Sequence, residues 1–145
     1  MKKIFKTIYN FFFCLKYPFY KCYNVFSGKF LGYTFTRYDD IPYGWRKAFG
    51  KQFSKELKNV LKEENFLKKF RFLDIKEKYG VLCIYTGPAT DKIFALLEKY
   101  ERMSEDICIK CGKTPAEYQT PGYILNLCKD CMIQQMNLTE ANTYI

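Results

Sequence analysis

The stretch that decides the fold is Cys108-Ile109-Lys110-Cys111-Gly112 together with Cys128-Lys129-Asp130-Cys131, and sixteen residues separate Cys111 from Cys128. The two residues inside each Cys-x-x-Cys pair let the chain turn back, so that both sulfurs can point at one ion. Two such pairs at this separation are the ligand set of a closed tetrahedral zinc site. We therefore expect Cys108, Cys111, Cys128 and Cys131 to hold a structural Zn²⁺, with a knuckle at each pair and a hairpin between them.

The alternatives to a zinc site at these four cysteines are two disulfides, an iron or iron–sulfur centre, and four unrelated thiols. The chain has seven cysteines, an odd number, and no convincing export signal precedes them. A reducing cytosol is therefore the favoured setting, and we expect a cytoplasmic protein without disulfides. Four cysteine ligands leave no coordination position for water, so the metal is expected to stabilise structure and to do no chemistry.

Composition limits the function as strongly as the cysteines do. A chain of 145 residues with 48% hydrophobic residues can bury one ordinary core, and a metal can stabilise a small second lobe. The net charge of +9 makes nucleic acid, a nucleotide or an acidic partner surface a plausible ligand. Histidine is absent, which excludes Ser-His-Asp triads, Cys-His dyads and histidine-ligated deaminases.

The first 40 residues form a basic, aromatic segment, which we treat as an N-terminal arm. Ile4, Ile8, Phe12 and Leu15 recur at helical spacing, and Pro18 is expected to end that helix. The helix is too short to cross a membrane. Three interpretations of the arm remain open: core packing or self-association, a nucleic-acid or partner surface, and binding at a membrane surface. Two further cysteines, Cys14 and Cys22, are expected to be ordinary buried thiols.

The middle of the chain, residues 41–104, is expected to be an α+β core. A short strand is predicted within 30–35, an amphipathic helix over 46–62, and a hairpin with strands 70–76 and 81–86 around a turn at 77–80. A second helix over 90–103 should turn Ile93, Phe94, Leu97 and Tyr100 inward. The fold class is thus α+β: a helix–β-hairpin–helix core, the N-terminal arm, and a zinc-ribbon lobe with a tail over residues 105–145.

The candidate ligand site lies at the hairpin. Ammonium groups at its turn can bind phosphate, and neighbouring rings can stack a base. The alternative interpretation is a solvated turn with internal salt bridges. Trp45, the one tryptophan, fits a core anchor better than a ligand platform, although both uses remain open. The candidate ligand-binding residues are Trp45, Lys76, Glu77, Lys78, Tyr79 and Tyr85.

An enzymatic alternative uses Asp74 and Lys76. An Asp-x-Lys sequence on a strand, with an upstream carboxylate such as Asp40 or Glu56, can hold Mg²⁺ and activate water, as in restriction-like nucleases. The motif is short and common by chance. We therefore expect a binding protein in preference to an enzyme.

A series of short motifs runs along the chain in a fixed order: Gly44-Trp45, the hairpin Ile75-Lys76-Glu77-Lys78-Tyr79-Gly80 with Leu82 and Tyr85, Tyr100-Glu101, Ser104, Cys108, Cys111-Gly112, Gly122-Tyr123-Ile124, Leu127-Cys128 and Cys131. This order resembles a family of small uncharacterised bacteriophage and prophage proteins. The resemblance covers residues 44–131, and the family has no settled activity. It implies a phage-type accessory protein that acts on host enzymes or host defence. One departure stands in the returning strand, where Cys83 occupies a position that tends to be arginine in the family.

The expected function is accordingly non-enzymatic binding of nucleic acid, a nucleotide or a host nucleoprotein through a basic surface, with zinc holding that surface in place. A protein-binding inhibitor or adaptor that uses the aromatic arm is the first alternative. The metal-dependent nuclease is the second.

Overall fold

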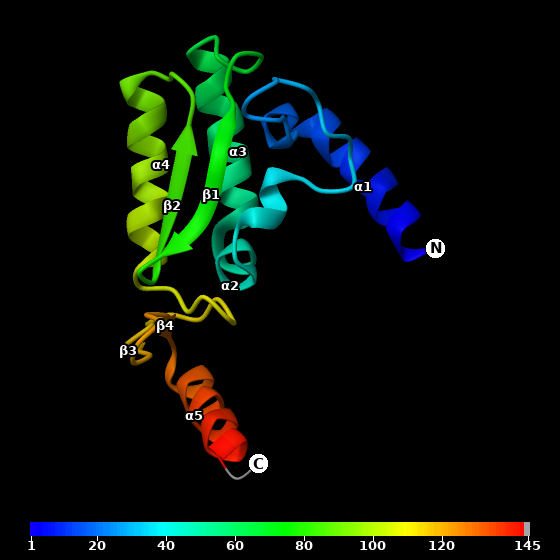
Figure 1. Cartoon of the computed structure of the whole chain (residues 1–145). Coiled ribbons are helices and arrows are strands. Elements are labelled where there is room, and N and C mark those ends of the chain that lie inside the picture. The colour runs from blue at the N-terminus through cyan, green and yellow to red at the C-terminus, as the bar shows by residue number, and fades with distance from the viewer. Residues whose placement is uncertain (144–145) are drawn as a thin grey trace.

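The structure is a computed structural model that describes residues 1–143. It confirms the α+β class: helices pack beside a two-stranded hairpin, and a smaller lobe containing the four cysteines lies below them (Figure 1). The N-terminal helix α1 (Lys2–Lys16) lies at the side of the larger body, and the C-terminal helix α5 (Lys129–Thr143) lies at the lower end of the molecule.

The hairpin consists of β1 (Phe72–Lys78) and β2 (Val81–Thr86), paired antiparallel with Lys78 opposite Val81. Tyr79 and Gly80 form its two-residue turn. Both have positive φ, 54° and 83°, which is the conformation that a type I′ turn requires. The predicted hairpin is confirmed. Its turn is shorter than expected, because Glu77 and Lys78 still belong to β1.

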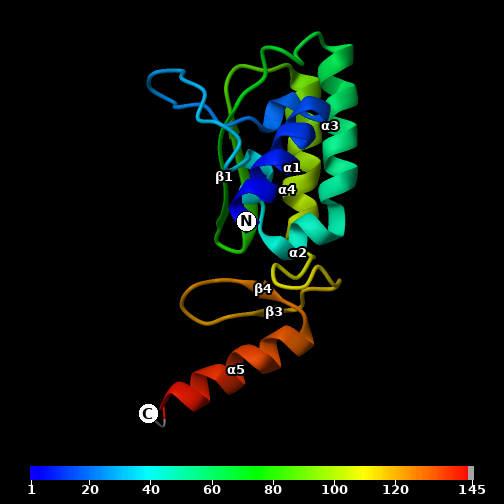
Figure 2. The same cartoon turned by 90° about the vertical axis from the view of Figure 1, so that its right-hand side faces the viewer.

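Two helices pack beside the hairpin. The first is a continuous helical stretch, made of α2 (Tyr43–Trp45), the π-helical η3 (Arg46–Gly50) and α3 (Lys51–Glu63). The second is α4 (Asp91–Ser104). Thr90 caps its N-terminus, because the Thr90 hydroxyl oxygen accepts a 3.4 Å hydrogen bond from the backbone N–H of Ile93. The helices lie side by side, and α4 runs along β2 (Figure 2). Both predicted helices are confirmed.

The core between these helices and the hairpin is aromatic and aliphatic. The predicted inward face of α4 is wrong at one residue, because Phe94 is exposed. Its neighbours on that face are buried as expected. The fully buried side chains of this core include Trp45, Phe53, Leu57, Leu61, Phe70, Leu82, Ile93 and Tyr100.

The N-terminal segment contributes to the same core. After α1 ends at Lys16, the short 3₁₀ helix η1 (Pro18–Tyr20) buries Phe19 and Tyr20, and the Tyr20 and Ser54 hydroxyls share a 2.7 Å hydrogen bond. The predicted end of the helix before Pro18 is confirmed. The strand predicted within 30–35 is wrong: Phe30 makes one isolated bridge with Tyr23, and the loop then continues to the 3₁₀ helix η2 (Arg37–Asp40).

Between α4 and α5, the lobe contains little regular structure. Its sheet has two short strands, β3 (Tyr118–Gln119) and β4 (Asn126–Leu127), paired antiparallel. Helix α5 follows directly and begins at Lys129. Within residues 1–143, no helix is both long enough and apolar enough to cross a membrane.

Candidate metal centre

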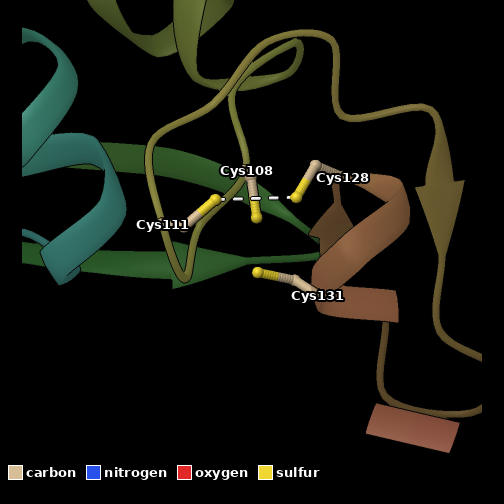
Figure 3. A group of neighbouring side chains, drawn as sticks. All are labelled: Cys108, Cys111, Cys128 and Cys131. Carbon is tan, nitrogen blue, oxygen red and sulfur yellow. Dashed lines mark hydrogen bonds between the residues drawn. The ribbon is translucent and has the colours of Figure 1, made fainter. Parts of the chain in front are cut away.

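The four predicted cysteine ligands come together at the base of the lobe. Their sulfur atoms all lie within 4.8 Å of one another, and the sulfurs of Cys111 and Cys128 are 3.5 Å apart (Figure 3). Sulfurs around a tetrahedral ion at a metal–sulfur distance of about 2.3 Å are separated by about 3.8 Å. All seven cysteines are free thiols. The group can therefore hold a metal ion, as the sequence predicts.

The first knuckle is fixed by the backbone around Cys108. Its carbonyl oxygen accepts a 2.9 Å hydrogen bond from the N–H of Gly112, and its own N–H donates at 2.8 Å to the carbonyl of Lys113. This closure requires a left-handed residue directly after Cys111. Gly112 supplies it with a φ of 80°.

The second knuckle uses a helix instead of a glycine. Cys128 follows β4 directly, and Cys131 lies in the first turn of α5, where the N–H of Met132 donates at 2.9 Å to the Cys128 carbonyl. Helical φ and ψ bring the two sulfurs together here, so Met132 needs no positive φ. The N-terminus of α5 also places the positive end of the helix dipole beside these sulfurs, which favours thiolates.

The thiols do not titrate alike. Burial raises the pKa of Cys108, but hydrogen bonds from the backbone of Cys128, Cys111 and Lys110 outweigh burial and lower it to about 7. Burial raises the pKa of Cys131, and the neighbouring sulfurs of Cys111 and Cys128 raise it further. Four negative sulfurs this close repel one another strongly. A bound cation is what allows all four to ionise together.

The lobe is fastened to the core beside the first knuckle. The N–H of Gly44 donates at 2.9 Å to the Ile109 carbonyl, and a side-chain carbon at Gly44 would lie 2.3 Å from the Cys108 carbonyl oxygen. On the other side of the contact, a side-chain carbon at Gly112 would lie 2.6 Å from the Gly44 carbonyl oxygen. Two glycines, Gly44 within α2 and Gly112 after the first knuckle, are thus required for the backbones to touch.

Trp45 belongs to this junction and not to a ligand site. Its side chain is 0% exposed, and its indole N–H donates at 2.9 Å to the Ile107 carbonyl, one residue before the first metal ligand. A ring without solvent exposure offers no face to a ligand. The assignment of Trp45 as ligand-binding is therefore wrong, and the core-anchor interpretation holds.

A second junction ties the lobe to the hairpin turn. The buried Asn126 amide donates to the carbonyls of Gly80, at 3.0 Å, and Glu105, at 3.3 Å. Glu77 accepts from the Gly80 N–H at 2.6 Å and from the Tyr123 hydroxyl. Asn126 is not among the site residues predicted from the sequence. Its position between Leu125 and Leu127, directly before the second knuckle, was the only local signal of a buried polar residue.

The other predicted ligand residues do not form one cluster. Lys76, Lys78 and Tyr85 share the outer face of the hairpin, whereas Glu77 points to the opposite face, where its carboxylate is already bonded. The Lys76 ammonium group lies 3.0 Å from Asp74 and 5.2 Å from the centre of the Tyr85 ring. Tyr79 is exposed at the tip. These contacts favour the interpretation as a solvated turn with internal salt bridges.

The carboxylates proposed for a nuclease each bond to a different partner and do not converge on one site. Asp74 pairs with Lys76, while Glu56 accepts from Lys99 and from the Tyr100 hydroxyl at 2.7 Å. Asp40 pairs with Arg37 at 3.2 Å. Among residues 1–139, the four cysteines are the only group of three or more His, Cys, Asp or Glu side chains close enough to share a metal.

Comparison with models of known protein families, with curated proteins and with solved structures gives no match.

Proposed function

We propose that the protein is a non-enzymatic, nucleic-acid-binding protein whose four-cysteine centre holds a structural zinc ion. Zinc is the ion that a closed set of four thiolates suits best, because it tolerates tetrahedral geometry and needs no other ligand. The centre joins the knuckles to the core through Gly44 and to the hairpin through Asn126. Its role in this proposal is to fix the lobe, and binding is assigned to a surface elsewhere.

The observation that carries the nucleic-acid proposal is a row of lysines along the outer face of the helix formed by η3 and α3. These positions repeat at intervals of three and four residues, so their side chains share one side of the helix. Like charges at this spacing destabilise a helix by about 0.2–0.5 kcal/mol per pair. The row spans about 22 Å at 1.5 Å per residue, enough to follow several backbone phosphates. The α3 lysine row consists of Lys47, Lys51, Lys55, Lys58 and Lys62.

Charge is concentrated where α1 meets this row. The pKa of Lys58 is lowered by burial and then by the positive charges of Lys62 and Lys16, so three ammonium groups lie near one another. The ammonium groups of Lys16 and Lys58 lie 5.3 and 5.5 Å from the centre of the Tyr17 ring. Anionic phosphates would relieve this repulsion. Repulsion between unneutralised cations is the physical reason to expect a polyanion at this place.

The test is binding to labelled single-stranded and duplex oligonucleotides, measured by fluorescence anisotropy over a range of salt concentrations. The parent is expected to bind most tightly at low salt. In Lys58→Gln/Lys62→Gln, the slope of log K against log salt should fall by about 0.7 per lost phosphate contact with a single strand.

The matched control is Arg102→Gln/Lys113→Gln, which removes two charges already paired with Glu98 and Asp130. It lowers the net charge by the same amount and should keep most of the parent's affinity. Equal losses in both double variants would show that net charge alone is responsible. No binding at low salt would refute the proposal outright.

The sequence resemblance supports a phage-type accessory role in a host cell, with host defence as the process affected, and we include that role in the proposal. The seven free thiols support the cytosol as its compartment. Co-purification of the tagged protein from its natural host, followed by identification of bound nucleic acid and protein, tests both points.

A further inference from the structure

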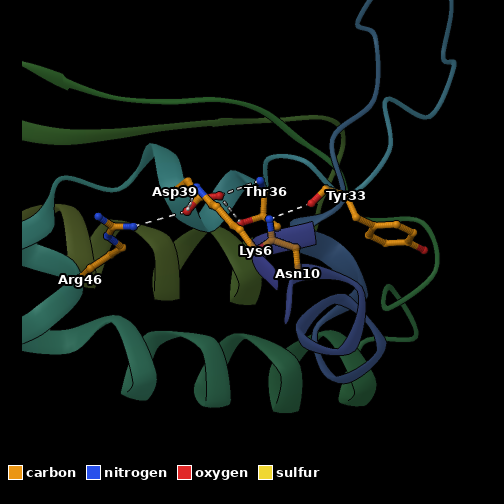
Figure 4. A network of polar contacts seen from close by, with 6 residues as sticks. All are labelled: Lys6, Asn10, Tyr33, Thr36, Asp39 and Arg46. Carbon is orange, nitrogen blue, oxygen red and sulfur yellow. Dashed lines mark hydrogen bonds and ion pairs between the residues drawn. The ribbon is translucent and has the colours of Figure 1, made fainter. Parts of the chain in front are cut away.

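Helix α1 packs on the rest of the molecule through a side that carries both polar and apolar residues. Lys6 forms a 3.5 Å ion pair with Asp39, and the Asn10 side-chain amide donates at 2.8 Å to the Tyr33 carbonyl (Figure 4). On the same side, Cys14 is buried and Phe13 packs against the core. This packed side uses only part of the apolar surface of the helix.

The remaining apolar surface of α1 faces solvent. Phe5, Ile4 and Phe12 are 68%, 64% and 62% exposed. A surface helix of a globular protein normally turns its apolar residues toward the core, whereas α1 leaves most of its apolar residues exposed. Exposed apolar side chains that form one continuous surface mark a binding site for another molecule. The α1 apolar face consists of Ile4, Phe5, Ile8, Phe11, Phe12 and Leu15.

The positive charge around the α1 apolar face indicates which kind of molecule binds there. Residues 1–38 contain seven basic side chains and no acidic one, and the first turn of α1 carries Lys2 and Lys3 without an acidic residue. Cations in a first turn are repelled by the helix dipole. A second copy of the chain would bring the same positive charges against them. An anionic surface with an apolar interior satisfies both the lysines and the aromatic side chains.

We propose that the α1 apolar face binds the surface of a membrane rich in anionic phospholipids. The helix is 15 residues long and lies flat, with its aromatic and aliphatic side chains in the boundary between headgroups and acyl chains. Lysines at both ends of the helix then contact lipid phosphates. This surface adjoins the α3 lysine row at Lys16, but none of its apolar residues belongs to the row.

The experiment is co-sedimentation of the full chain with vesicles of phosphatidylglycerol and phosphatidylcholine, and with vesicles of phosphatidylcholine alone, at about 0.15 M salt. We expect binding to the anionic vesicles and a partition coefficient roughly tenfold or more lower for Phe5→Ser/Ile8→Ser/Phe12→Ser. The control Phe94→Ser removes an exposed aromatic ring from α4 and should bind as the parent does. Phe5→Trp should show fluorescence quenching by brominated lipid, because the native Trp45 is buried.

Equal binding of the triple variant and the parent would overturn the proposal, since it would show adsorption by net charge without insertion. Absence of binding to anionic vesicles would overturn it as well. Sedimentation velocity without lipid addresses the rival occupant: a parent dimer that the triple variant loses would assign the face to a second copy. The triple variant keeps the α3 lysine row, so its oligonucleotide affinity tests the proposed function independently.

Discussion

The indole N–H of Trp45 donates a 2.9 Å hydrogen bond to the backbone oxygen of Ile107, and this buried bond joins the helical core to the chain entering the metal centre. The first metal ligand, Cys108, follows at the next residue. Contacts with the core thus help to set the position of the lobe.

Replacing Trp45 with Phe should destabilise the fold by about 1–3 kcal/mol, because the Ile107 carbonyl is left buried without its donor. Chemical denaturation followed by far-ultraviolet circular dichroism measures the change. An unaltered unfolding midpoint would contradict the importance given to this bond.

Gly112→Ala should impair both stability and metal retention, since the added methyl group lies 2.6 Å from the Gly44 carbonyl oxygen. Gly122→Ala is the matched control. Gly122 has a similar φ of 78°, but no atom lies within 4 Å of the added carbon, so it carries the backbone strain without the clash. Thermal unfolding of both variants separates the two costs, and equal losses would remove the clash as the cause.

Purified parent protein should contain about one zinc ion per chain, and Cys128→Ser should lose it and unfold the lobe. Cys83→Ser, on β2 and outside the group of four sulfurs, should keep the metal. Elemental analysis gives the stoichiometry. Iron in place of zinc, or metal retained by Cys128→Ser, would refute the zinc assignment.

Acid stability should depend on Tyr100. The hydrogen bond from its hydroxyl lowers the pKa of Glu56 below the ordinary 4.5. A lowered folded pKa contributes stability that is complete above pH 4.5 and is lost as the pH falls through the folded value. Tyr100→Phe should therefore be less stable than the parent at neutral pH, and the difference should shrink below pH 4.5. Tyr79→Phe, at the exposed hairpin tip, should show no such dependence.

Local patterns were sufficient for much of the architecture. The cysteine spacing predicts the group of four sulfurs, and the residues of β2 and the end of α1 before Pro18 are also predicted correctly. These features depend on spacing, alternation and proline chemistry within a few residues. The helix predicted over 90–103 agrees with α4, and the structure adds that the Thr90 side chain caps its N-terminus.

The errors arise where distant segments decide the outcome. Helical spacing in α1 correctly indicates an amphipathic helix, but it cannot show that Lys6 and Asn10 face inward toward Asp39 and Tyr33. Phe94 has the spacing of a core residue yet lies outside the packed face of α4. Gly44 looked isolated in the sequence, and only the fold shows that its missing side chain lets the first knuckle approach.

The amide of Asn126 holds the carbonyls of Gly80 and Glu105 together while its oxygen accepts from Gln119 at 3.0 Å. All of these groups are electrically neutral. Dissolved electrolyte weakens attraction between full charges far more than it weakens such contacts. These bonds between the lobe and the core should therefore depend little on salt concentration. Added salt can then release a charged ligand while the bonds made by Asn126 stay in place.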